Sequence, residues 1–194
     1  DIHVENGSGN VDVRGFQGNA TSVRSASGSI VARAVFGEVR IDSASGNIKM
    51  ERLGGELDVN SSSGRIRLED GEGRVAISSS SGDIELSSVS GNIEASSTSG
   101  SVEVVDGEGV LTIASTSGSI ICEAIALRGT SSFRTISGAI EVALVDTVDR
   151  YSYDLSSVSG RIQVGNTKAG NTLERDGGST LIEAHTTSGS IMIR

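Results

Sequence analysis

Few side chains in this chain of 194 residues could act as a nucleophile, a general base or a metal ligand. The histidines are His3 and His185, and the single cysteine is Cys122. A hydrolytic triad needs a histidine between a serine and a carboxylate, and no spacing around either histidine indicates one. Cys122 stands where neighbouring repeats carry valine, leucine or methionine, so we expect it to be a small core residue. The sequence therefore predicts a protein that is not an enzyme.

The tetrapeptide DGEG occurs at 70–73 and at 106–109, which raises the question of a calcium site. It lacks the Gly-Gly-x-Gly-x-Asp pattern of calcium-binding β-rolls, so polar turn chemistry explains it better. A single cysteine excludes an internal disulfide and a multi-cysteine metal site. We predict no metal and no cofactor.

The candidates for recognition lie in the last third of the chain, where the regular spacing is interrupted near 144–152 and 165–178. Insertions in repeat proteins usually become loops on a binding face, and this third of the chain combines its insertions with both signs of charge and with aromatic and imidazole side chains. The candidate binding residues are Arg150, Tyr151, Lys168, Glu174, Arg175, Asp176 and His185. Tyr153 and Leu155, in contrast, fall at the phase of inward-pointing residues.

The strands that must position these residues are indicated by a sequence repeat of 18 residues. Each repeat is marked by a glycine that directly follows a serine. A fixed period of this length is typical of a repeat architecture. A second glycine series lies nine residues after the first, as in Gly73 and Gly91. We expect the serines one and three residues before each marker to bond backbone groups at a corner. The marker glycines, called register glycines below, are at 9, 28, 46, 64, 82, 100, 118, 138, 160 and 189.

Apolar residues alternate with polar ones after each register glycine, as Ile84 and Leu86 do around Glu85. This is the period of a strand with one buried face. Two such short strands per repeat cannot bury their faces alone, but stacked coils form two parallel sheets around a narrow interior. We predict an all-β fold, a single-chain β-solenoid (β-helix) of about ten coils of ~18 residues, forming one domain over residues 1–194. Positions six apart do not match, which disfavours a left-handed three-sided helix and favours a right-handed one.

The composition excludes several classes of partner. The 16 basic and 25 acidic residues give a net charge of −9, which repels nucleic acid and anionic membranes. No run approaches the ~20 apolar residues of a membrane span. We expect no nucleic-acid partner and no direct insertion of this chain into a membrane.

The repeated phrase SxSGxIxV, seen as STSGSVEV, SISGAIEV and SVSGRIQV, resembles that of the bacterial adhesin-like β-helix families. The resemblance covers nearly the whole chain, and members of these families are largely of unknown function. It implies a cell-envelope or extracellular location, with a targeting or anchoring segment that we expect to precede Asp1.

Three functions remain open from the sequence. The favoured one is a non-enzymatic cell-envelope or surface interaction domain that binds a protein or carbohydrate at the cell surface. The alternative is a structural stalk or self-assembling scaffold like the bactofilins, because the final SIMIR would leave a strand edge for end-to-end self-association. The least favoured is a carbohydrate-active β-helix enzyme, which would need clustered charges in a groove.

Overall fold

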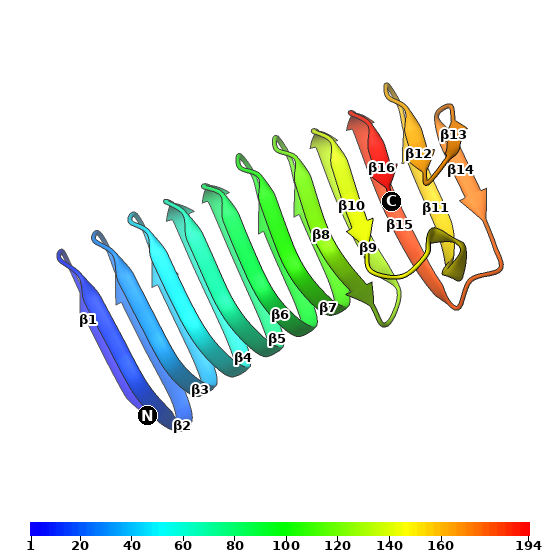
Figure 1. Ribbon diagram of the computed structural model, residues 1–194. Coiled ribbons are helices and arrows are strands. Elements are labelled where there is room, and N and C mark those ends of the chain that lie inside the picture. Colours follow the sequence, from blue (N-terminus) through cyan, green and yellow to red (C-terminus); the bar gives the residue numbers. More distant parts are fainter.

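The computed structural model describes residues 1–194 and contains 16 strands that belong to one continuous sheet wound into a rod (Figure 1). The only helix, η1 (Val148–Arg150), has three residues, and no helix is long and apolar enough to span a membrane. The strands are β1 (Ile2–Asn6), β2 (Val11–Ser25), β3 (Ile30–Ser43), β4 (Ile48–Ser63), β5 (Ile66–Ser81), β6 (Ile84–Ser97), β7 (Val102–Ser115), β8 (Ile120–Leu127), β9 (Ser131–Ser137), β10 (Ile140–Leu144), β11 (Tyr151–Ser157), β12 (Ile162–Val164), β13 (Thr167–Ala169), β14 (Thr172–Arg175), β15 (Thr180–Ser188) and β16 (Ile191–Ile193).

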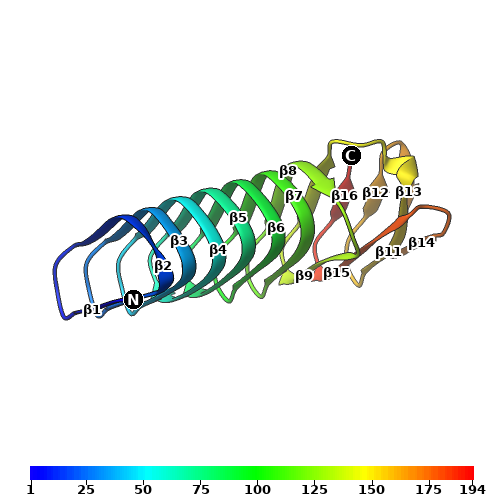
Figure 2. The same ribbon diagram turned by 90° about the horizontal axis from the view of Figure 1, so that it is seen from below.

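Each coil from β2 to β7 is one long strand that bends in the middle. The sequence had predicted two separate short strands per coil. The segment after a register glycine forms the first face of the rod, and the segment before the next one forms the second face (Figure 2). Neighbouring coils pair in parallel and in register, for example Ile66 with Ile84 and Val75 with Ile93. The prediction of an all-β solenoid with coils of ~18 residues and parallel sheets is confirmed.

The bend between the two faces is made by a residue in the left-handed backbone region at the same phase of successive coils. Asp70 and Asp106 occupy this place with φ of 58° and 55°. Both belong to the DGEG tetrapeptides, which therefore form the bend, as turn chemistry predicted.

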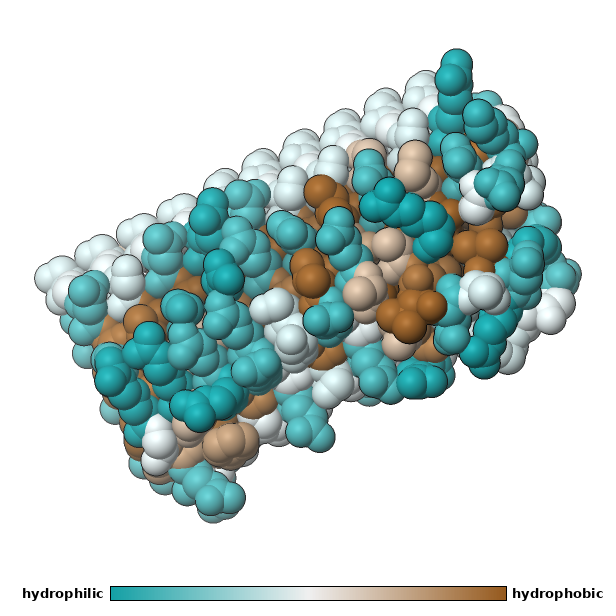
Figure 3. All heavy atoms as spheres, viewed as in Figure 1, coloured by the Kyte–Doolittle hydropathy of each residue, from teal (hydrophilic) through white to brown (hydrophobic).

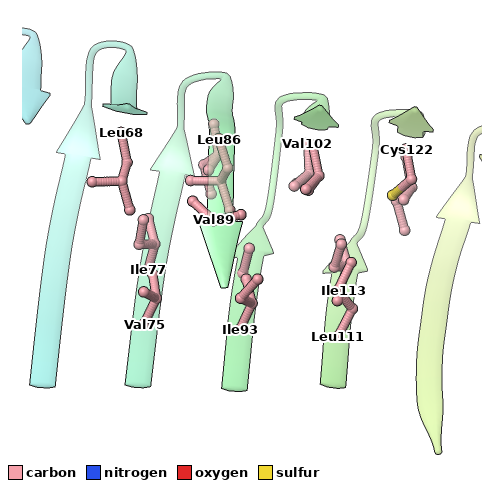
Figure 4. Close-up of a cluster of buried hydrophobic side chains, with 14 of the residues drawn as sticks. Leu68, Val75, Ile77, Leu86, Val89, Ile93, Val102, Leu111, Ile113 and Cys122 are labelled. Carbon is pink, nitrogen blue, oxygen red and sulfur yellow. The ribbon is translucent and has the colours of Figure 1, made fainter. Parts of the chain in front are cut away.

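The core is a stack of aliphatic side chains that project from both faces into a narrow interior (Figure 4). Ile84 and Ile66 are fully buried, and the alternation read from the sequence is confirmed. Cys122 also lies in this stack, as predicted, and burial raises the pKa of its thiol. A thiol with a raised pKa holds little thiolate and is a poor nucleophile.

The serine rows at the Ser-Gly corner bond the backbone, as predicted. The serine three residues before a register glycine is buried, and in most coils its hydroxyl donates to a carbonyl of the corner: Ser61 Oγ lies 2.9 Å from the Ser63 carbonyl oxygen. Ser79 is an exception, because its buried hydroxyl has no hydrogen-bond partner. From Ser97 onward the acceptor is a glycine of the preceding coil, as in Ser115 Oγ to the Gly100 carbonyl at 3.0 Å. The serines thus satisfy carbonyls that the strand ladder leaves free at the turn.

The last coils are not stacked in chain order. After β10 the chain crosses through residues 145–150, passes over one level of the stack, and forms β11 and β12. The final strands then return into the level left open: β15 pairs with β9 and β11, and β16 pairs with β10 and β12. Figure 2 shows β16 lying beside β12. We call β15 and β16, with the turn between them, the inserted coil.

Two predictions about this region are wrong. The C-terminal strand is not an open edge, because β16 has a neighbour on both sides. Residues 165–178 are not a free loop, because they contain β13 and β14, which pair antiparallel with β12 and β11 and cap the end of the rod.

The number of turns also differs from the prediction. All ten register glycines do stack at one corner, with Gly189 between Gly138 and Gly160. The rod nevertheless has about 8 turns rather than about ten.

Candidate functional site

A shallow groove of about 600 Å³ runs along the second face beside the Ser-Gly corner of the last six coils in space. We call it the C-terminal groove. Most of its 16 lining residues are serine and threonine. Its wall consists of residues that lie two positions before a register glycine in the sequence. Its floor consists of residues that lie four positions before a register glycine. The wall and floor residues used below are Ser96, Thr98, Ala114, Thr116, Arg134, Ile136, Ser156, Val158, His185 and Thr187.

The wall of the groove is a row of outward-facing β-branched side chains, the β-branched ladder. In spatial order it consists of Thr98, Thr116, Ile136, Thr187 and Val158, all exposed. Ile136 is 54% exposed and Val158 69% exposed. At ~4.8 Å per ladder step, the row extends over about 19 Å.

The same phase of the first coils carries only small side chains, namely Ala26, Ala44, Ser62 and Ser80. In Figure 3 the turn edge of the rod is a band of intermediate hydropathy, as expected for serine and glycine. The two halves of the rod therefore present different surfaces along one edge. The repeat is uniform in the core but not at the groove.

The floor of the groove holds the polar groups that could orient a ligand. Parallel pairing sets His185 between Arg134 on β9 and Ser156 on β11. Ser156 Oγ lies 2.7 Å from His185 Nδ1, so a cross-strand hydrogen bond holds the imidazole ring. Arg134 Nη2 lies 3.7 Å from Glu183 Oε2, a long and exposed ion pair that leaves guanidinium donors for a ligand.

The meeting of a serine with a histidine raises the question of acyl transfer. That chemistry needs an acid to orient the second imidazole nitrogen and donors for an oxyanion. Glu183, the nearest acid along β15, faces Arg134, and no carboxylate hydrogen-bonds His185. The arrangement is better suited to hydrogen bonding with a ligand than to nucleophilic attack.

Two of the predicted binding residues, Arg150 and Arg175, make structural contacts at the capped end of the rod. Arg150 pairs with Asp146, Nη1 to Oδ1 at 2.7 Å. Arg175 Nη1 lies 3.1 Å from Asp149 Oδ1, and its guanidinium stacks 4.8 Å above the ring of Tyr153. The first ion pair lies within the crossover, and the Arg175–Asp149 pair joins the cap to the crossover.

Tyr151 was predicted to lie in a binding loop, and this is wrong. It is the first residue of β11, only 3% exposed, and burial raises the pKa of its phenol. The inward orientation predicted for Tyr153 and Leu155 is confirmed, and burial raises the pKa of Tyr153 to about 12.

The other predicted residues are separated in space. Lys168 and Glu174 are exposed on β13 and β14, and Asp176 is exposed in the linker that follows. None of them lines the C-terminal groove, whereas His185 does. The predicted set is therefore divided between the cap and the groove.

Sequence reasoning missed most of the groove, including Arg134, Ile136, Ser156 and Val158. A signal was present, since all of them stand two or four residues before a register glycine. Their proximity depends on the spatial order of the last coils, which the repeat does not reveal.

A family model described as Toastrack DUF4097 matches residues 1–106 and, in a second and overlapping match, residues 73–194. Together the two matches cover the whole chain. No curated protein and no solved structure matches it.

Proposed function

This chain belongs to the toastrack DUF4097 family, a β-helix family of unknown function, and from that premise we propose that it is a non-enzymatic interaction domain of the cell envelope. It binds a protein or a carbohydrate at the cell surface, and the C-terminal groove is the binding site. The rod serves as a rigid support that presents the groove.

The observation that carries the proposal is the β-branched ladder beside the polar floor. Apolar side chains exposed singly are ordinary on protein surfaces. Here Ile136 and Val158 stand two steps apart in one row, with the methyl group of Thr187 between them. A continuous strip of methyl groups bordered by an arginine resembles the composition of interface centres.

The polar floor supports a ligand rich in hydroxyl or carbonyl groups. Arg134 offers several N–H donors in a fixed plane, and the hydroxyls of Ser96 on the floor and of Thr98 on the adjoining wall both donate and accept. Sugar hydroxyls and peptide carbonyls satisfy such groups equally well. The length of the ladder, about 19 Å, suits an extended chain that lies parallel to the rod.

The two other functions lose support. The scaffold hypothesis rested on an open C-terminal strand, and β16 is instead internal. The hypothesis of a carbohydrate-active enzyme requires clustered charges, whereas the floor combines one arginine, one histidine and hydroxyls.

Binding of the labelled domain to intact cells of the source organism, measured by flow cytometry, tests the proposal. Val158→Asp should reduce binding at least about tenfold, because an aspartate desolvated at an interface costs more than 1.4 kcal/mol. Val145→Asp is the matched control, since Val145 is 67% exposed and lies outside the groove.

Treatment of the cells with protease or with periodate separates a protein partner from a carbohydrate one. If Val158→Asp and Val145→Asp are both folded and Val158→Asp binds the cells as strongly as the wild-type domain does, the binding site lies outside the C-terminal groove. Equal losses in the two variants would show that the effect comes from charge alone.

A further inference from the structure

The inserted coil is the only one whose two neighbours along the rod both precede it in the chain. Its lower neighbours are β9 and β10, and its upper neighbours are β11 and β12. Each coil up to β9 and β10 stacks on its predecessor in the chain, whereas β11 and β12 are separated from β9 and β10 by the inserted coil. This level of the stack must stay open until the last residues arrive.

The open level is a recognition slot with two edges. β15 pairs with β11 from Tyr151 to Ser157 and with β9 from Ser131 to Ser137. Corner contacts add to the ladders, since Thr186 Oγ1 donates to the Gly138 carbonyl at 3.2 Å and Ser157 Oγ donates to the Gly189 carbonyl at 2.9 Å. The slot thus accepts one strand pair of defined register, joined by a Ser-Gly corner.

Only a short linker, residues 176–179, connects the inserted coil to the cap. It crosses the start of β11 at Gly178, where a Cβ atom would lie 2.2 Å from the Tyr151 carbonyl carbon. Ser152 Oγ fixes this crossing, 3.1 Å from the Gly178 nitrogen and 3.2 Å from its carbonyl oxygen. Return of the coil into its own slot depends on that close passage.

We propose that the inserted coil is exchangeable and that the slot of one copy accepts residues 180–194 of a second copy. Reciprocal exchange gives a dimer in which every ladder contact is preserved and only the linker changes path. The choice between closed monomer and exchanged dimer is made during folding, because the native coil is paired on both edges. Exchange therefore increases with the protein concentration at refolding.

Mixed refolding of two cysteine variants tests the exchange. Arg134 and His185 are paired residues on β9 and β15, so their Cα separation suits a disulfide. When Arg134→Cys and His185→Cys proteins are unfolded, mixed, refolded at high concentration and oxidised, we expect a disulfide-linked heterodimer. Native Cys122 is buried and does not compete.

The matched control is the pair Ser96→Cys and Ala114→Cys, paired residues on β6 and β7, outside the inserted coil. Mixing these two proteins should give only background cross-linking. If the Arg134→Cys and His185→Cys mixture gives no more heterodimer than this control, the proposal is overturned.

A second variant tests the linker. Gly178→Val obstructs the crossing over β11, so the coil can enter the slot of another copy more easily than its own. Light scattering after refolding should show a several-fold larger dimer fraction than for wild type. Gly170→Val, at a glycine with no atom near its Cβ position, should leave the fraction unchanged. A dimer fraction for Gly178→Val no larger than that of wild type overturns the proposal that the linker at residues 176–179 controls exchange.

Discussion

Replacement of Gly91 by alanine is expected to cost most of the stability of the solenoid. Gly91 has φ of +117°, and an added Cβ would lie 2.1 Å from the Gly73 carbonyl oxygen of the preceding coil. The backbone conformation alone costs about 1–3 kcal/mol for a residue with a side chain. No side-chain rotation relieves a contact with backbone, so the two coils must separate and lose ladder hydrogen bonds.

Each lost ladder bond contributes about 1 kcal/mol. Loss of three or four bonds around the corner, together with the strain, gives roughly 4–7 kcal/mol. The whole stability of a typical domain is about 5–15 kcal/mol. Gly91→Ala should therefore be marginally folded or unfolded.

Three further glycines separate the cost of a positive φ from the cost of a contact with the backbone of the neighbouring coil. Gly82 has no positive φ, but its Cβ would lie 2.1 Å from the Gly64 carbonyl oxygen; Gly82→Ala should cost about 3–4 kcal/mol from lost bonds alone. Gly15 has φ of +64° with no atom within 4 Å, so Gly15→Ala should cost about 1–2 kcal/mol. Gly170 has neither constraint, and Gly170→Ala should be neutral.

Urea unfolding followed by far-ultraviolet circular dichroism measures the four free energies, provided that the slope with denaturant stays constant. The expected order of loss is Gly91, Gly82, Gly15, Gly170. If Gly82→Ala is as stable as Gly170→Ala, close stacking does not explain the register glycines and the reasoning is wrong.

Three more perturbations have defined outcomes. Ile84→Asp buries an unpaired charge in a fully enclosed position and should lower the free energy of unfolding by several kcal/mol, whereas exposed Glu103→Lys should change the melting temperature little; equal effects would contradict the inside-outside assignment. Arg175→Ala removes an ion pair and a ring contact of the cap and should cost about 1–2 kcal/mol, against under ~0.5 kcal/mol for Lys168→Ala in thermal unfolding. Two side-chain hydrogen bonds, first from Lys49 and then from Arg33 of the preceding coil, lower the pKa of Glu51 below its usual 4.5. A carboxyl group whose pKa is lowered by folding stabilises the folded state above about pH 4.5, and this contribution is lost as pH falls through the folded pKa. Glu51→Gln should therefore make the melting temperature fall less steeply as the pH is lowered. An unchanged fall would show that other carboxylates cause the loss of stability in acid.

The sequence by itself determined the repeating part of this protein. The side-chain alternation around Ile84, the inward phase of Cys122 and Tyr153, and the hydroxyl bonds of the serine rows all follow from position relative to a register glycine. These properties are local to one coil and its two neighbours, so a repeat of fixed length specifies them. The family resemblance followed from the same phrase.

The tertiary structure alone decided the order of the last coils. The segments SVSGRIQV and TTSGSIMI carry the same pattern, so either one fits at either level of the stack. The crossover, the antiparallel cap and the linker through Gly178 select the arrangement in which the later segment lies inside. That choice places His185 against Ser156, 29 residues apart in the chain, and buries Tyr151. Parallel ladders recognise register and not chain order, because every coil presents the same backbone donors and acceptors to the next.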